Sequence, residues 1–325
     1  MISFYNKSVN LILAGSSWLG SFLGSQRTYI KGMPLSVSME LTNFCNLKCT
    51  ECSSGSGQMT RPRGFMDIAL FRKAVDELKP FLYNINLYFQ GEPMMHPLFF
   101  SFPEYCRGIH STVSTNGHYL SPENSERIVN SGLSHLIVSL DGTDQDCYSK
   151  YRVNGDYEKV ISGLESVSKA KALYKSAMKL EIQFLVNSFN EHQIPEVKSI
   201  AGNLNASLRL KSMQIINKEK TGVWLPRERK FRRYKNVDGN FVIKNNFPDS
   251  CARLWFNPVI TWDGKVIPCC FDKDAEHIMG DITQDSFREI WNGPRYRVFR
   301  RAILRDRSMI EICRNCTSGL QDAKY

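Results

Sequence analysis

The sequence predicts an α/β protein built from a partial (β/α)6 TIM-like barrel and a small C-terminal α+β domain. Strand-like and helix-like stretches alternate from about residue 35 to residue 216, which is typical of a parallel sheet with right-handed crossovers. Six strands are too few to close an eight-stranded barrel, so we expect an open sheet. After residue 250 the pattern changes to short strands and turns, which indicates a second, smaller unit.

The expected strands and helices follow one another in alternation. Asp67 and Ser121 are suited to cap the starts of two helices, and Gly132 is suited to follow the end of one. Strands are expected at 36–41, 85–89, 111–114, 136–140, 180–186 and 208–210, and helices at about 67–79, 122–131, 157–174 and 191–202. In such a sheet the carboxyl ends of the strands form the edge where binding and catalytic residues gather.

Four regions are expected along the chain. They are an N-terminal extension (1–34), the barrel (35–216), a polar and basic linker (217–250) and the small domain (251–325). In the small domain, Asp263-Gly264 between two apolar runs predicts a β-hairpin, and two short helices are expected near 284–291 and 296–304. Because so few strands bury little apolar surface, we expect a metal to stabilise this domain.

Charge and cysteine content bear on partners and compartment. The chain has 42 Lys and Arg residues against 32 Asp and Glu residues, a formal net charge of +10, but no basic run interleaved with aromatic residues. We therefore expect no nucleic-acid partner. Seven of the ten cysteines fall in three short groups. This grouping favours metal ligation in a reducing compartment, so a cytoplasmic protein is expected.

The N-terminal segment 9–20 is apolar and follows Lys7, a pattern shared with signal peptides. It is interrupted by polar and glycine residues and is too short to span a bilayer. An amphipathic helix that packs on the domain is the simpler interpretation, and contact with a membrane surface is the alternative.

The first cysteine group, Cys45, Cys49 and Cys52, directly follows the first expected strand. Three thiolates on one loop can each bind one iron of a cubane cluster and leave the fourth iron open to a ligand. The spacing fits zinc poorly, because zinc needs a fourth ligand and no histidine is adjacent.

This Cys-x3-Cys-x2-Cys motif resembles the signature of the radical S-adenosylmethionine (SAM) superfamily, and the resemblance extends from about residue 36 to the C-terminus. It implies a [4Fe–4S] cluster whose open iron chelates SAM. One electron then splits the C–S bond and yields a 5′-deoxyadenosyl radical, which takes a hydrogen atom from the substrate. The resemblance also implies an electron donor such as flavodoxin or ferredoxin.

Two further segments match the family at successive strand ends. Gly91, Glu92 and Pro93 resemble the segment that receives the SAM amino group, and Ser114 and Asn116 lie in a segment similar to one that holds the ribose. Each triplet alone is an ordinary turn, but their order along the chain follows that of the family.

The next two strand ends continue the resemblance. Ser139, Asp141 and Arg152 resemble the family's carboxylate- and ribose-binding positions, and an arginine suits a carboxylate because its planar fork pairs bidentately. Val186 ends the fifth strand, where family members pack the adenine. Glu51 departs from the family, which often has an aromatic residue before the third cysteine, so that residue's packing role is not expected here.

The second group of cysteines lies in the small domain and comprises Cys251, Cys269, Cys270, Cys313 and Cys316. Four thiolates from separate elements would make a fully ligated centre. By the residues alone, a zinc ribbon and an iron–sulfur cluster both satisfy this pattern.

The spacing around these cysteines resembles the SPASM auxiliary-cluster domain, in its shortened twitch form, and is similar to that of aminocyclitol dehydrogenases. The resemblance implies one auxiliary [4Fe–4S] cluster, hence two clusters per chain. It implies Cys251, Cys269, Cys313 and Cys316 as ligands, with Cys270 as a possible substitute for Cys269.

The expected reaction is a net two-electron oxidation, the dehydrogenation of a sugar- or cyclitol-like small molecule, with the auxiliary cluster accepting one electron. Asp272 is a candidate general base, although a solvated turn residue explains it equally well. The alternative is modification of a peptide or protein side chain by a maturase, through thioether formation or epimerisation. About 35 residues precede the first strand, too few for a leader-binding module.

Overall fold

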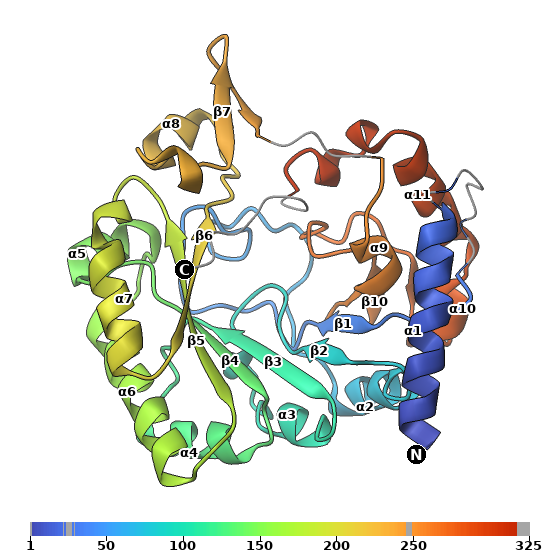
Figure 1. The fold of residues 1–325 in the computed structure, drawn as a ribbon, viewed down its shortest axis with the longest axis horizontal. Helices are drawn as coiled ribbons and strands as arrows, with labels where there is room; N and C mark the ends of the chain where they lie inside the picture. The colour runs from blue at the N-terminus through green and yellow to red at the C-terminus, as the bar shows by residue number, and fades with distance from the viewer. Residues whose placement is uncertain (1, 22, 24–27, 29, 245–248, 317–325) are drawn as a thin grey trace.

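A curved sheet with helices on its outer face forms the main body of the protein (Figure 1). The computed structural model describes residues 2–21, 23, 28, 30–244 and 249–316. The barrel strands are β1 (Ser36–Met39), β2 (Asn84–Asn86), β3 (His110–Thr115), β4 (His135–Ser139), β5 (Lys179–Val186) and β6 (Ser207–Ser212). The intervening helices are α2 (Ile68–Leu78), α3 (Ser101–Tyr105), α4 (Pro122–Asn130), α5 (Gln145–Tyr151), α6 (Tyr157–Leu173) and α7 (Ile194–Asn203).

All six barrel strands pair in parallel and in the order of the chain. The sheet stays open at β6, which is an edge strand. The predicted fold class, a partial (β/α)6 barrel with a further C-terminal part, is therefore confirmed. The carboxyl ends of β1 to β6 form one rim, which sets the position of the site described below.

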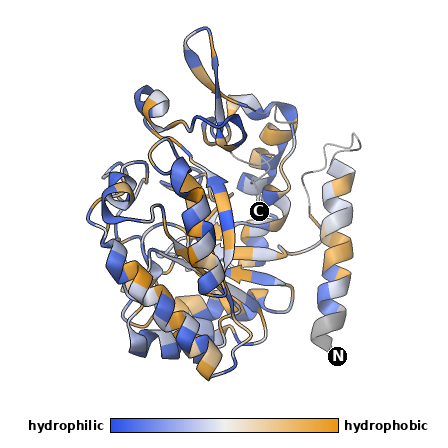
Figure 2. Ribbon diagram, turned by 60° about the vertical axis from the view of Figure 1, so that its left-hand side comes forward, coloured by the Kyte–Doolittle hydropathy of each residue, from blue (hydrophilic) through white to orange (hydrophobic). Residues whose placement is uncertain are grey.

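The helices begin where their sequences provide caps. The Asp67 carboxylate accepts the N–H groups of Ala69 and Leu70 at the start of α2, and the Ser121 hydroxyl accepts that of Asn124 at the start of α4. Each cap satisfies N–H groups that have no partner within the helix. The helices turn their apolar residues to the sheet, and Figure 2 shows hydrophobic residues along the strands and on one side of these helices.

The C-terminal strands extend the same sheet instead of forming a separate one. Strand β9 (Val259–Ile260) pairs in parallel with β1, and β10 (Lys265–Ile267) and β11 (Gly280–Asp281) follow in antiparallel pairing. The predicted hairpin at Asp263-Gly264 is present, with Gly264 at φ +84°, a conformation that favours glycine. Helices α9 (Arg253–Phe256), α10 (Phe287–Trp291) and α11 (Pro294–Arg305) complete this part.

The segment expected to be a linker carries its own structure. It contains α8 (Thr221–Trp224) and the hairpin of β7 (Tyr234–Val237) and β8 (Asn240–Ile243), which projects at the top of Figure 1. Asp238 and Gly239 have positive φ values of 49° and 83°, as a two-residue hairpin turn of type I′ requires. Residues 245–248 lie outside the described residues.

The N-terminal segment forms helix α1 (Ile2–Gly20), which packs on the C-terminal part. The Asn10 side chain donates to Met33 O (3.1 Å) and accepts the Met33 N–H (2.7 Å), and the Trp18 ring lies 5.8 Å from that of Phe256. The outer face carries exposed Leu11 and Ile12. No helix in the described part of the chain has the length and apolarity needed to cross a membrane.

Candidate metal centre and cofactor site

The three cysteines of the first group lie on one loop at the carboxyl end of β1. Cys45, Cys49 and Cys52 are free thiols, and Cys49 is buried. The Lys48 N–H, inside the loop, donates to Val153 O (2.9 Å) after helix α5. The loop is therefore held against the end of the fourth β-α unit as well as by β1.

Hydrogen-bond donors surround these thiols. The Leu47 N–H lies 3.5 Å from the Cys45 Sγ atom, and the Asn116 Nδ2 atom lies 4.0 Å from it. The Arg152 Nη1 atom lies 3.7 Å from the Cys49 Sγ atom. Such donors stabilise negative charge on sulfur, as thiolate ligands need.

The Gly91-Glu92-Pro93 turn after β2 packs tightly against the chain that leads into the cysteine loop. Gly91 has φ +74°, and a Cβ atom there would come within 2.6 Å of Phe44 O. The Glu92 N–H donates to the same carbonyl (2.7 Å). Only glycine fits at position 91, and it brings the Glu92 carboxylate next to the loop.

The Glu92 carboxylate is fully buried and accepts two short hydrogen bonds from the end of β3. These come from the Thr115 hydroxyl (2.7 Å) and the Asn116 N–H (2.7 Å). Burial raises the pKa of Glu92 to about 7, although these hydrogen bonds oppose the shift. Ser114, one residue earlier on the same strand, is half-buried. A cation bound at Glu92 would favour its charged form.

Asp141, after β4, anchors Arg152. The Arg152 Nε atom donates to Asp141 Oδ2 (2.6 Å), and the Leu185 N–H donates to Oδ1 (2.7 Å). The Asp141 side chain is fully buried, and these partners satisfy both of its oxygen atoms. Ser139, at the end of β4, is buried beside them. Asp141 therefore binds both β5, at Leu185, and Arg152, and Arg152 in turn reaches Cys49.

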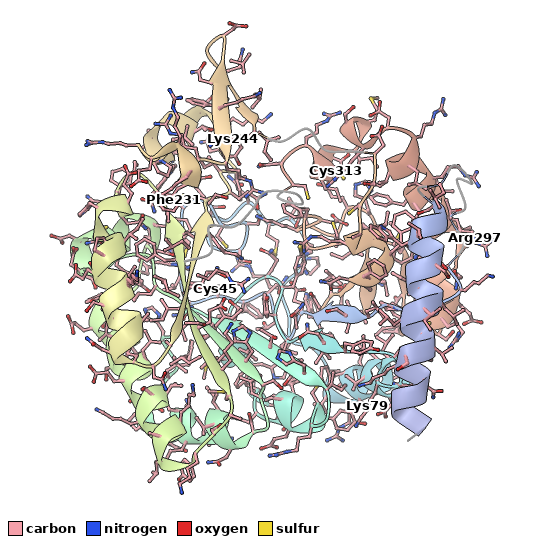
Figure 3. All side chains as sticks on the ribbon, viewed as in Figure 1. Cys45, Lys79, Phe231, Lys244, Arg297 and Cys313 are labelled. Carbon is pink, nitrogen blue, oxygen red and sulfur yellow. The ribbon has the colours of Figure 1, made fainter. Side chains whose placement is uncertain are left out.

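Four of the five C-terminal cysteines are buried and lie within electrostatic range of one another, namely Cys251, Cys269, Cys313 and Cys316. Burial raises the pKa of Cys313 to about 11. Cys270 is half-buried, and its Sγ atom lies 3.3 Å from the Arg253 Nη1 atom. Figure 3 shows Cys45 near the centre of the molecule and Cys313 above it, so the two groups occupy separate places.

Two family models match this chain. One describes the radical SAM superfamily and matches residues 39–176, which include the first cysteine group and the strand ends through β4. The other describes SPASM, an iron–sulfur cluster-binding domain, and matches residues 251–317. Residues 39–176 therefore form a radical SAM domain. The C-terminal part of the chain is a SPASM-type domain, and [4Fe–4S] clusters and SAM are the cofactors that these domains imply.

Several curated proteins are similar in sequence to this chain. Mycofactocin maturase MftC of Mycobacterium tuberculosis is 28% identical over 196 residues, which are 59% of this chain and 47% of that protein. AdoMet-dependent heme synthase of Methanosarcina barkeri is 28% identical over 176 residues, which are 53% of this chain and 48% of that protein. The chain thus spans about half the length of these curated relatives.

Solved radical SAM structures share the fold at low sequence identity. BtrN in complex with AdoMet and 2-DOIA has a TM-score of 0.56 and 18% identity, over 88% of this chain and 94% of that chain. Streptococcus suis SuiB bound to S-adenosylmethionine has a TM-score of 0.63 and 12% identity, over 85% and 69%.

The donor sets fit iron–sulfur clusters. Both groups consist of thiols, and in a cubane each thiolate binds a different iron. Burial raises the pKa of Cys45 to about 12, so binding of iron must displace the thiol proton.

The structure distinguishes Val186 from its neighbour in the radical SAM domain. Val186 is fully buried in the main hydrophobic core, whereas Leu185 packs against the separate apolar cluster that contains Cys49 and against which Cys45 and Cys52 also pack. Successive residues of a strand face opposite sides, so only one of the two can face the cysteine loop. We therefore propose Leu185 in place of Val186 as the apolar contact for a bound adenine.

Basic side chains beside the cysteines were not predicted from the sequence, apart from Arg152. Arg253 contacts Cys270, and Arg307 hydrogen-bonds to Cys313. The Lys273 ammonium lies within electrostatic range of Cys52 and Cys270. These cations offset the negative charge that clusters on thiolates would bring. No sequence motif marks them, because they come from different loops.

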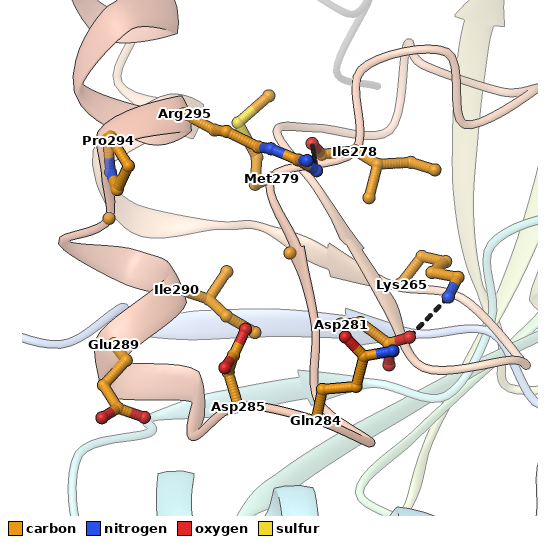
Figure 4. A pocket seen from close by; sticks show the side chains of 12 residues that line it. Lys265, Ile278, Met279, Asp281, Gln284, Asp285, Glu289, Ile290, Pro294 and Arg295 are labelled. Atoms are coloured by element: carbon orange, nitrogen blue, oxygen red, sulfur yellow. Dashed lines mark hydrogen bonds and ion pairs between the residues drawn. The ribbon is translucent and has the colours of Figure 1, made fainter.

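Two other features complete the description of this part of the chain. The Asp272 carboxylate accepts the N–H groups of Glu276 (2.8 Å) and His277 (2.9 Å), which agrees with a structural turn residue. A pocket of about 630 Å³ lies between β11 and helices α10 and α11, where Lys265 pairs with Asp281 (Figure 4). None of the cysteines lines it.

Proposed function

We propose that this enzyme binds a [4Fe–4S] cluster and SAM at Cys45, Cys49 and Cys52 and oxidises its substrate by two electrons. A second cluster, on Cys251, Cys269, Cys313 and Cys316, would accept one of these electrons. The observation that carries the proposal is the pairing of a three-thiol loop at the strand ends with a separate, buried four-thiol set. Three thiolates leave one iron open for SAM, and four leave none.

When bound, the cluster supplies the electron that splits the C–S bond of SAM into methionine and a 5′-deoxyadenosyl radical. The residues of this chain orient the SAM molecule. Glu92 would bind the ammonium group, Arg152, which Asp141 holds in place, would bind the carboxylate, and Asn116 would bind the ribose. We also assign the half-buried Ser114, the buried Ser139 and the Gly91-Glu92-Pro93 turn to this SAM site.

The proposed oxidation removes two protons and two electrons from the substrate. A substrate C–H bond gives a hydrogen atom to the 5′-deoxyadenosyl radical, which becomes 5′-deoxyadenosine. The substrate radical, on a carbon that carries a hydroxyl group, would lose the hydroxyl proton to a base and one electron, which a cluster held by Cys251, Cys269, Cys313 and Cys316 would accept, and a C=O bond would result. An external one-electron acceptor, such as the oxidised form of the donor protein, would then take that electron, and SAM would be consumed as co-substrate. An electron donor such as flavodoxin or ferredoxin would supply the first electron.

The proposed substrate is a sugar- or cyclitol-like small molecule. Two observations support it: the cysteine spacing, which is similar to that of aminocyclitol dehydrogenases, and the fold shared with BtrN over 94% of that chain. The alternative, modification of a peptide, is favoured by the fold shared with SuiB, whose structure with the precursor peptide SuiA has a TM-score of 0.62.

Anaerobic reconstitution tests the proposal. We expect about eight iron atoms per chain and 5′-deoxyadenosine formation with dithionite and SAM. A screen of sugars, aminocyclitols and peptides would then identify the substrate class by the mass of the product, which falls by two hydrogens on dehydrogenation. About four iron atoms with one zinc would refute the electron-acceptor role, and the absence of 5′-deoxyadenosine would refute the enzyme assignment.

Replacing both Cys313 and Cys316 with serine separates the two cluster functions. We expect iron to fall from about eight to about four atoms per chain, because two ligands of the auxiliary cluster are lost. SAM cleavage should persist while two-electron oxidation is lost. Iron analysis and product mass spectrometry measure both effects, and Cys147→Ser serves as the control. Retention of eight iron atoms would contradict the ligand assignment.

SAM binding should depend on pH through Glu92. Its pKa is raised to about 7, so the carboxylate is mostly charged at pH 8 and mostly protonated at pH 6. Because the SAM ammonium prefers the charged form, we expect about tenfold weaker binding at pH 6 than at pH 8. Anaerobic titration of the holoenzyme with SAM measures this. Glu92→Gln should bind weakly and show a flat profile, and an equally steep profile in that variant would exclude Glu92 as the titrating group.

A further inference from the structure

The chain that leaves β6 passes between the two cysteine groups. Strand β6 ends at Ser212, and the five residues that follow it, 213–217, are buried or half-buried. Met213 and Ile215 pack in the same apolar cluster as Cys49. This segment, 213–217, is called the β6 exit below.

Glu51 binds the β6 exit from the side of the first cysteine loop. Its Oε2 atom accepts the N–H groups of Ile216 (2.7 Å) and Asn217 (3.0 Å). The side chain is buried, and its Oε1 atom has no hydrogen-bond partner within the described residues. Glu51 directly precedes Cys52, so its hydrogen bonds anchor the backbone next to a proposed cluster ligand.

Asn315 binds the β6 exit from the side of the second cysteine group. Its Nδ2 atom donates to Ile215 O (3.0 Å), and its Oδ1 atom accepts the Tyr234 hydroxyl (2.7 Å). The Tyr234 hydroxyl also accepts the Ile215 N–H (3.0 Å). Asn315 lies between Cys313 and Cys316, in the loop that carries two of the proposed auxiliary ligands.

The two sets of hydrogen bonds meet on adjacent residues, Ile215 and Ile216. We infer that Glu51 is a positioning residue that fixes the two cluster loops relative to each other through the β6 exit and Asn315. The inference rests on the proposed function only for the identity of the clusters. It gives Glu51, at a position that is often aromatic in the family, a purpose that an aromatic side chain could not serve.

The physical reason lies in the two N–H groups of the exit. An aromatic residue at position 51 would remove the acceptor of both N–H groups, which belong to half-buried residues, and N–H groups without an acceptor are costly to desolvate. A carboxylate that accepts two N–H groups forms charge-assisted bonds, which are stronger than neutral ones. The electron that leaves the substrate radical must reach the auxiliary cluster, so the distance between the two loops affects the proposed reaction directly.

Hydrogen exchange of the holoenzyme tests the link itself. In Glu51→Leu, we expect the amides of 214–217 and also those of 313–316 to exchange roughly tenfold faster or more, because both charge-assisted bonds from Glu51 to the β6 exit are lost. Glu51→Gln keeps an acceptor oxygen and should restore most of the protection. The control is Glu228→Gln, an exposed glutamate paired with Lys230. Faster exchange confined to 214–217 would refute a link to the auxiliary loop.

Electron paramagnetic resonance of the reduced holoenzyme tests the positioning role. In Glu51→Leu, we expect the magnetic interaction between the two clusters to weaken and the lines of the spectrum to broaden. The midpoint potential of the auxiliary cluster should shift, and about eight iron atoms per chain should be retained. Asn315→Ala leaves the first loop intact and should act in the same direction, and the double variant should add little to either single change. If Glu51→Leu binds fewer than about eight iron atoms, the spectrum of Asn315→Ala alone tests the positioning role.

The outcomes separate this inference from the proposed function. Wild-type spectra in Asn315→Ala, or equal defects in Glu51→Gln and Glu51→Leu, would overturn the positioning role. If the wild type binds zinc in the second group, the proposed function fails. Coupled exchange between the two loops would then still support the positioning of the loops by Glu51, and uncoupled exchange would overturn it.

Discussion

Replacement of Cys49 with alanine is expected to lower the iron content from about eight to about four atoms per chain and to reduce SAM cleavage to background. Cys49 is the buried member of its group, and the Arg152 guanidinium faces its Sγ atom. With this thiol removed, one iron of the cubane has no protein ligand, and two thiolates on a loop cannot retain the cluster.

The control for this variant is Cys147→Ala, which removes a half-buried thiol that belongs to neither cysteine group. Iron analysis, the visible spectrum of the anaerobic protein and chromatographic detection of 5′-deoxyadenosine measure the result. The auxiliary cluster should remain, so a residual iron–sulfur spectrum is expected. Eight iron atoms and intact SAM cleavage in Cys49→Ala would show that the cluster lies elsewhere.

Replacement of Arg152 with glutamine should have the second largest effect, on both stability and SAM affinity. The Asp141 side chain is fully buried, and Arg152 pairs with it at 2.6 Å. Removal of one partner from a buried pair leaves an uncompensated charge and costs about 3–5 kcal/mol. In a protein of this size we expect the melting temperature to fall by roughly 10 °C.

Anaerobic thermal denaturation and SAM titration measure these two effects. Arg227→Gln is a matched control, because Arg227 is an exposed arginine in the basic segment. The double variant Arg152→Gln with Asp141→Asn should recover part of the stability, since no unpaired charge is left, but it should not recover SAM affinity. Unchanged SAM affinity in Arg152→Gln would remove this residue from the proposed SAM site.

The alternation of strands and helices could be predicted from the sequence, because each element carries its own signal. Asp67 and Ser121 cap helices where expected, and the cysteine motif follows the first strand. The β7–β8 hairpin had a local signal too, the Asp238-Gly239 pair. The polar composition around this pair favoured a linker, whereas the turn residues indicated the hairpin.

Features that depend on pairing between distant segments could not be predicted. The face of β5 that carries Leu185 depends on how the strand is seated in the sheet, and the alternating pattern does not decide which face meets the cysteines. Glu51 looked like a departure from a motif, because its partners, the N–H groups of Ile216 and Asn217, lie 165 and 166 residues further along the chain. Such contacts carry no local signal.

The parallel pairing of β9 with β1 has a consequence for how the chain folds. Without β9, strand β1 would be an edge strand, with unpaired backbone groups available to another molecule. The edge of β1 can therefore be covered only after residues 259–260, more than 200 residues further along the chain, have been synthesised. Until then the nascent protein exposes one edge of the strand that leads into its cysteine loop, and this open edge can pair with other chains.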